Sequence, residues 1–121
     1  MLFLGQEMAR KKMLVVDPGK IQWEPIGHTE VAKGVWVKVL NHDEETGAMA
    51  LLGKLDKGFH EAKHKHSSDC DVMILEGKLV DGKGNEIKRG MYVFFRAGVE
   101  HGPFDAPEGC ILFVYSNGPL W

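Results

Sequence analysis

The chain has little cysteine, no long apolar run and almost no excess of either charge. Its 121 residues include only Cys70 and Cys110, too few for the disulfide framework of a small secreted domain. No run approaches the ~20 apolar residues that span a bilayer. The short apolar start is followed, not preceded, by basic residues, unlike a signal peptide. With a formal net charge of −2, we expect a cytoplasmic protein that binds neither nucleic acid nor membrane.

What the sequence does contain is a series of short runs rich in β-branched and aromatic residues, separated by turn signals. A chain of this length suits one domain. The segment "DGKGNE" between two of these runs is typical of a hairpin turn. Short runs at a spacing of roughly ten residues predict an all-β sandwich or small barrel. The expected strands are 34–40, 47–55, 71–80, 90–98 and 109–116, and one short helix is expected at 5–13.

Histidines are concentrated in the segment "HEAKHKH", where His64 and His66 are two residues apart. On a strand, both imidazoles would lie on one face with Cβ atoms roughly 7 Å apart, close enough to bind one metal ion. Lysines alternate with them, so a solvated basic surface is an equally good interpretation. His60 would lie about 13 Å from His64 along an extended strand, at the rim of a site. We expect His28 and His42 on the surface.

A third histidine follows the expected strand at 90–98. The strand ends at the turn "RAG", and His101 comes just after this turn. A histidine that follows a strand rich in apolar residues lies near the core and is a candidate third metal ligand. The alternative is a loop histidine that packs on Pro103 and Phe104.

The first histidine segment resembles the first of two motifs of the cupin superfamily. That motif reads G-x5-H-x-H-x3,4-E and runs into a strand that closes on glycine. Here Gly58 is followed after five residues by His64 and His66, and the run "VMILEG" closes on Gly77. Asp71 stands near the position of the motif glutamate.

The second segment resembles the second cupin motif, G-x5-P-x-G-x2-H-x3-N. Gly90, Gly98 and His101 match it in order and spacing. Arg96 stands where proline is usual, and Asp105 stands where asparagine is usual.

The resemblance implies an all-β cupin fold, which is a double-stranded β-helix or jelly-roll barrel, in a single domain. We expect residues 31–121 to form the barrel and residues 1–30 to form an N-terminal segment. Small cupins commonly pair, so the resemblance also implies a homodimer. The apolar run at 13–16 is suited to serve as a dimer arm that adds an edge strand to a neighbour's sheet.

Two groups of cupins are most similar to this chain. One is the metal-binding cupin domain at the C-terminus of certain bacterial anti-sigma factors, which resembles the segments "HGPFDAPEGCILFV" and "HKHSSDCDVMILEGKLVDGKG". The other is the small dioxygenases that cleave acetylacetone or dihydroxyacetophenone-type ketones. These are similar in size and in their tryptophan segments before the barrel, and they hold their metal with three histidines.

The fourth metal ligand stays open at this point. The anti-sigma type places a carboxylate four residues after the second histidine, and here that residue is Cys70. Strand alternation sets Asp69 and Asp71 on the face opposite Cys70. Three arrangements remain: three histidines alone, which we favour and which suit Fe(II) and oxygen; Cys70 as a thiolate, which favours zinc; or Asp71 turned inward by a β-bulge.

We expect one divalent transition metal per chain, with Fe(II) preferred and Zn, Ni or Mn as alternatives. The predicted function is an Fe(II) dioxygenase that cleaves a C–C bond of a small-molecule β-diketone or hydroxylated aryl ketone. The alternatives are a sensor or binding module of the anti-sigma cupin type, and a non-oxidative isomerase or lyase acting on a small polar substrate. About thirty residues precede the barrel-like pattern, so we expect no helical partner-binding domain.

Strand alternation predicts an apolar substrate pocket, which favours a ketone over a sugar or phosphate. Its expected members are Met73, Leu75, Tyr92 and Phe94. Met49 or Leu51 would lie alongside. The sequence does not identify the catalytic residues, and the weak candidates are Glu100 and Arg96, of which Arg96 can anchor an anionic substrate. Glu100 and Asp105 flank the third histidine and can hydrogen-bond to it.

Overall fold

The computed structural model describes residues 10–26 and 33–120, and this part of the chain is almost entirely β. It has a 3₁₀ helix at Pro18–Lys20, and no helix in it is long and apolar enough to span a membrane. The first strands are β1 (Glu24–Pro25), β2 (Val35–His42), β3 (Met49–Leu55), β4 (Phe59–Glu61) and β5 (Cys70–Asp81). The others are β6 (Glu86–Lys88), β7 (Tyr92–Phe95), β8 (Phe104–Ala106) and β9 (Cys110–Ser116).

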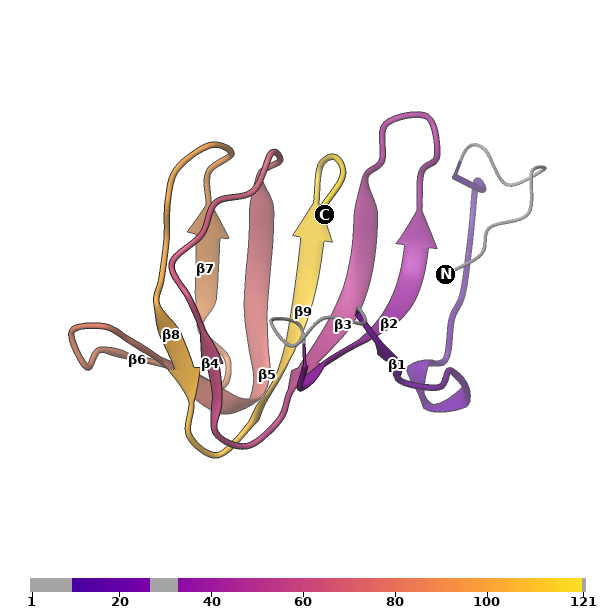
Figure 1. Ribbon diagram of the computed structural model, residues 1–121. Helices are drawn as coiled ribbons and strands as arrows, with labels where there is room; N and C mark the ends of the chain where they lie inside the picture. Colours follow the sequence, from indigo (N-terminus) through magenta and orange to yellow (C-terminus); the bar gives the residue numbers. More distant parts are fainter. Residues whose placement is uncertain (1–9, 27–32, 121) are drawn as a thin grey trace.

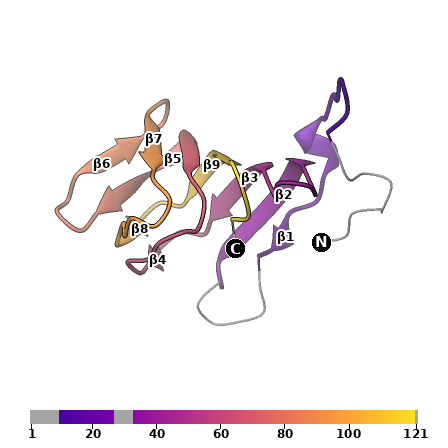
Figure 2. The same ribbon diagram turned by 90° about the horizontal axis from the view of Figure 1, so that it is seen from above.

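The strands form one antiparallel sheet that curls back on itself. Its order is β1-β2-β3-β9-β5-β8-β4, and β6 and β7 also pair with β5. Figure 1 shows β2, β3, β9, β5 and β7 side by side. Seen from above, β8 and β4 lie on the other side of the curl, across from β5 (Figure 2). The predicted all-β architecture is confirmed.

The long strand β5 makes the curl possible because its two halves have different neighbours. Residues Cys70 to Met73 pair with β7, whereas Val80 and Asp81 pair with β8. Between these halves the register with β9 shifts at a bulge beside Ile74. A bulge bends a strand and increases its twist, so β5 can leave one layer and enter the other.

The expected strands and hairpin are present as β2, β3, β5, β7 and β9 and the turn after β5. The sequence did not indicate β4, β6 or β8, because strands of three residues are too short to show alternation. The expected helix lies mostly outside the described residues, and its last four residues, 10–13, are not helical. The boundary near residue 30 stays a prediction, although β1 pairs with β2 across it.

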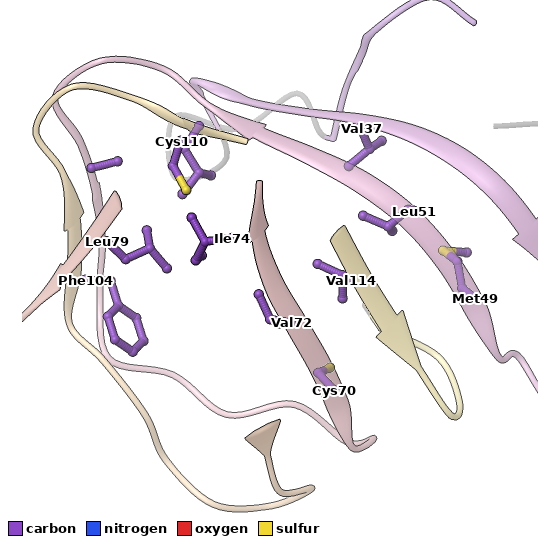
Figure 3. Packing of buried hydrophobic residues seen from close by; sticks show 12 residues of the cluster. Val37, Met49, Leu51, Cys70, Val72, Ile74, Leu79, Phe104, Cys110 and Val114 are labelled. Carbon is purple, nitrogen blue, oxygen red and sulfur yellow. The ribbon is translucent and has the colours of Figure 1, made fainter. Parts of the chain in front are cut away.

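The inside of the curl holds the hydrophobic core. Buried apolar side chains from β2, β3, β5, β8 and β9 gather in one interior (Figure 3). The central members are Val37, Leu51, Val72, Ile74 and Val114, and Ile74 is fully buried. Burying one such side chain contributes about 1.5–3 kcal/mol, so these contacts hold the two layers together.

Gly77, which closes the first motif, lies where β5 passes the start of β9. Its φ of 72° is in the left-handed region, and a Cβ here would overlap the carbonyl oxygen of Gly109. Only glycine accepts both conditions at no cost. The motif glycine therefore permits the close approach of the two strands.

Candidate metal centre

Three imidazoles converge at one point inside the curl. His64 and His66 come from the segment between β4 and β5, and His101 comes from the segment between β7 and β8. The Nε2 atom of His64 lies 3.1 Å from Nε2 of His66 and 3.1 Å from Nε2 of His101. The donor atoms of the three residues all lie within 4.8 Å of one another. The structure thus brings together the three histidines that the motifs single out.

The backbone holds these segments in place. His64 and His101 form an isolated β-bridge, and the N–H of Gly98 donates to the carbonyl of His66 at 2.8 Å. The spacing of His64 and His66 predicts that they lie on a regular strand. The structure has this single bridge instead, and it is enough to turn both imidazoles to the same side.

Two carbonyl oxygens fix the tautomers of the first two histidines. Nδ1 of His64 donates to the oxygen of Ala62 at 2.8 Å, and Nδ1 of His66 donates to the oxygen of Leu120 at 3.2 Å. A carbonyl only accepts, so in the neutral rings both Nε2 atoms carry lone pairs. These lone pairs face each other and repel unless a cation lies between them.

A transition-metal ion fits this donor set. Metal–imidazole bonds are about 2.0–2.1 Å long, so two adjacent ligands at a right angle have nitrogens about 3 Å apart. The observed 3.1 Å separations match this value. His64, His66 and His101 would hold the ion through Nε2, and the carbonyl partners of Nδ1 would keep the first two rings in the metal-binding tautomer.

The electrostatics of the site favour the neutral form of two of its imidazoles, those of His66 and His101. Burial, with the neighbouring His64 and His66, lowers the pKa of His101 to about 4. Burial and His64 also lower the pKa of His66. The ring of Phe95 stacks on His101 at a centroid distance of 4.1 Å, which fixes the plane of that imidazole. Neutral imidazole is the form that binds a metal.

An apolar cavity of about 200 Å³ opens beside the three histidines. It lies inside the curl, and His66 and His101 are part of its wall. Most of the wall is aliphatic or aromatic and includes Val37, Leu51, Val72, Phe95, Leu112 and Val114. A metal ion held by the histidines would therefore face a small, largely apolar space.

Comparison with known proteins identifies the family. A family model described as the ChrR cupin-like domain matches residues 11–120. The chain belongs to the ChrR cupin-like family. No curated relative matches its sequence.

Solved structures share the fold of this ChrR-like cupin. An RmlC-like cupin from Shewanella frigidimarina has 23% identity and a TM-score of 0.70, over 92% of this chain and 95% of that chain. An acetylacetone dioxygenase from Acinetobacter johnsonii has 17% identity and a TM-score of 0.69, over 98% and 81%. The anti-sigma protein ChrR, in complex with SigE from Rhodobacter sphaeroides, has 20% identity and a TM-score of 0.62, over 80% of this chain and 50% of that one. The predicted cupin fold is confirmed.

The predicted pocket residues of this ChrR-like cupin lie on the wrong face of the sheet. Met73, Leu75, Tyr92 and Phe94 point outward and are 37%, 38%, 58% and 49% exposed. Their neighbours in β5 and β7, including Val72 and Phe95, face the cavity instead. The predicted orientation was wrong, because residues 72–75 and 92–95 are all apolar or aromatic and alternation cannot tell their inner face from their outer face. Leu51 does line the cavity, whereas Met49 is part of the core.

Neither Cys70 nor an aspartate joins the histidines. Cys70 is 2% exposed and lies in the cavity wall, but it is not in the group of converging donors within the described chain. Its thiol donates weakly to the oxygen of Ser68 at 3.8 Å, and burial raises its pKa. Asp71 accepts a hydrogen bond from the hydroxyl of Tyr92, and Asp69 accepts one from the N–H of Ala97 at 2.7 Å. Both carboxylates are thus engaged away from the site.

The remaining candidates also lie away from the cavity. Glu100 is exposed, 3.7 Å from the ammonium of Lys63, and Arg96 is exposed on the turn after β7. Asp105 does not reach His101. It pairs instead with His60, whose Nδ1 lies 2.7 Å from the carboxylate on the outside of β4.

Two other histidines were expected on the surface. His42 ends β2 and is half-buried, so that expectation was wrong. His28 lies outside the described residues.

One acidic residue of the site was missed from the sequence. Glu61 ends β4 and lines the cavity, and its Oε1 lies 3.7 Å from Nε2 of His64. Burial raises the pKa of the Glu61 carboxyl, and His64 partly opposes this effect. The sequence carries no local signal for this residue, because a three-residue strand is too short to show alternation.

Proposed function

We propose that this protein is a metal-dependent cupin enzyme that acts on a small, largely apolar carbonyl compound. In its most specific form, the proposal is an Fe(II) dioxygenase that cleaves a C–C bond of a β-diketone or a hydroxylated aryl ketone. The observation that carries it is the convergence of three imidazole donors beside an apolar cavity. When bound, Fe(II) would supply Lewis acidity and redox chemistry with O₂.

The charge of the donor set supports a chelating oxygen substrate. Neutral imidazoles would leave the full positive charge of a divalent ion in place, so two oxygens of an enolisable ketone would bind well. The three histidines would hold the ion beside the cavity, where a substrate could reach it. A sugar or a phosphate would leave its polar groups unpaired against the aliphatic wall.

The chain's own residues would orient the substrate and keep water out. Val72, Leu112 and Val114 come from neighbouring strands of the sheet and form a continuous aliphatic surface. Phe95 covers one face of His101 and also lines the cavity. These side chains would pack on the carbon skeleton and exclude water from the reacting oxygens.

The test is oxygen uptake by protein reconstituted with Fe(II) under anaerobic conditions. We expect consumption of O₂ with acetylacetone or a dihydroxyacetophenone, and carboxylic acid products from C–C cleavage. Zinc-loaded protein and the His101→Ala variant are the controls and should consume none. Conversion of a ketone without oxygen uptake would favour a non-oxidative isomerase or lyase.

A second candidate function is a metal-dependent binding module. The match to the ChrR cupin-like family over residues 11–120 favours it, because the structure named ChrR is an anti-sigma protein bound to SigE. If the protein is a binding module, we expect tightly bound zinc in the purified protein. After replacement of the zinc by Fe(II), we expect no substrate-dependent oxygen uptake. Metal analysis combined with the uptake assay therefore separates the two functions.

A further inference from the structure

The cavity beside the histidines has one carboxylate in its described wall, that of Glu61. The residue comes from β4, whose two ends, Phe59 and Glu61, are half-buried, whereas His60 between them is exposed. A half-buried carboxylate in an apolar wall is costly unless it faces a positive charge or a hydrogen-bond donor. The position of Glu61 therefore needs a partner that the aliphatic side chains around it do not provide.

The geometry points this carboxylate at the metal centre. Oε1 of Glu61 lies 3.7 Å from Nε2 of His64, the same nitrogen that faces His66 and His101. The carboxylate is nevertheless not part of the group of donors that lie within 4.8 Å of one another. It is thus close to the direct metal ligands without being one of them. From this position a carboxylate can accept a hydrogen bond from a water or substrate bound to the metal.

Other acidic residues near the motifs cannot take this place. The carboxylates of Asp69 and Asp71 accept hydrogen bonds from Ala97 and Tyr92, and neither residue lines the cavity. Glu100 is exposed beside Lys63. Only Glu61, among the described acidic residues, combines a place in the cavity wall with a contact to a converging histidine.

We propose that Glu61 is the charged positioning residue of the metal centre, acting from outside the coordination sphere. Its negative charge strengthens the binding of a divalent cation to the three histidines. The same charge repels a preformed small anion from the open positions, so the site favours a neutral carbonyl compound that approaches as a ketone. This inference rests on the metal site of the proposed function, not on its dioxygenase chemistry.

Two opposite effects on binding test this role. We expect Glu61→Gln, which removes the charge and keeps the shape, to weaken Co(II) binding about tenfold, a typical effect of an outer-sphere partner. Glu61→Asp should retain most of the affinity. Azide should bind the Co(II) form of Glu61→Gln several times more tightly than it binds the wild type. General damage to the fold would weaken both kinds of binding.

The control variant is Glu100→Gln, which removes an equal charge outside the cavity and should change neither affinity. The positions of the Co(II) absorption bands should be the same in Glu61→Gln as in the wild type. Unchanged Co(II) and azide affinities in Glu61→Gln would overturn the proposal, as would band shifts that report a lost direct ligand. Failure of the metal site itself is distinguishable, because then the wild type would not bind Co(II) at the histidines.

Discussion

His64 and His101 bind each other twice through their backbones. The N–H of His64 donates to the carbonyl of His101 at 2.9 Å, and the N–H of His101 donates to the carbonyl of His64 at 2.8 Å. Their Nε2 atoms, from residues 37 positions apart in the sequence, lie 3.1 Å apart. The separation of the two side chains is therefore set by the main chain, which preorganises the site before a metal binds.

The three-histidine site predicts that His101→Ala loses most of the metal. Purified wild-type protein should carry close to one transition-metal ion per chain, measured by elemental analysis. Two remaining histidines bind a divalent ion much more weakly than three, because one bond and its fixed geometry are lost. His60→Ala is the control, since His60 is exposed and pairs with Asp105. Full metal retention in His101→Ala would refute the site.

Cys70→Ser should keep the metal. The thiol of Cys70 is buried in the cavity wall but does not belong to the converging donors, so its loss should cost only packing, on the order of 1 kcal/mol of unfolding free energy. Cobalt-substituted wild-type protein should show no sulfur-to-metal charge-transfer band, and its spectrum should match that of the serine variant. An intense near-ultraviolet band that disappears in Cys70→Ser would show a thiolate ligand.

Acid should destabilise the metal-free protein through His101. The pKa of this imidazole falls from an ordinary 6.5 to about 4 on folding. Between these values the unfolded chain binds more protons than the folded one, so stability is full above about pH 6.5 and decreases as the pH falls toward 4. Urea midpoints of metal-free protein measured across this range should drop with acid. His101→Asn cannot titrate and should show a shallower dependence.

Gly77→Ala should destabilise the fold. An added Cβ would overlap the carbonyl oxygen of Gly109 and would also force alanine into a φ of 72°. Gly84→Ala is a matched control, because Gly84 has a φ of 84° but open space around it. The control should lose about 1 kcal/mol for the backbone conformation alone. We expect a clearly larger loss in Gly77→Ala, and equal denaturation midpoints would contradict the close approach of β5 and β9.

The homodimer stays a prediction, and the outer face of β5 and β7 suggests how to test it. Met73, Tyr92 and Phe94 present apolar surface there, and among the described strands β7 pairs with β5 alone. Light scattering should give twice the chain mass for the wild type. Phe94→Ser should shift the mass toward the monomer, whereas Val99→Ser, at another exposed apolar position, should not. A wild-type protein that is monomeric in solution would refute the predicted homodimer.

The sequence indicated the long strands and the histidine set but not which side of β5 faces inward. Strand identity follows from β-branched runs between glycine turns, and these signals are local. Which side chains of 72–75 and of β7 face inward cannot be predicted from the local sequence. Every residue there is apolar or aromatic, so either face can be buried. The bulge beside Ile74 and the pairing of β5 with two layers decide it, and neither has a sequence signature.

Glu61 was missed for a related reason. Strand β4 has three residues, too few to establish alternation, and its partner β8 is equally short. The motif spacing predicts a carboxylate after His66, where this chain has Cys70, and says nothing of a carboxylate before His64. Glu61 precedes His64 by three residues, and this spacing alone does not predict that their side chains meet. Strand β4 ends at Glu61, and the chain is irregular until His64 forms its bridge with His101.

The carbonyl of Leu120 makes the metal centre depend on the segment after β9. It accepts the hydrogen bond that fixes the ring of His66, and the neighbouring carbonyl of Pro119 accepts one from the hydroxyl of Ser68 at 2.9 Å. The two acceptors lie 54 and 51 residues beyond their donors in the sequence. The metal-binding tautomer of His66 is therefore selected only when this distant segment packs against the loop before β5, whereas His64 already has its acceptor two residues away in Ala62.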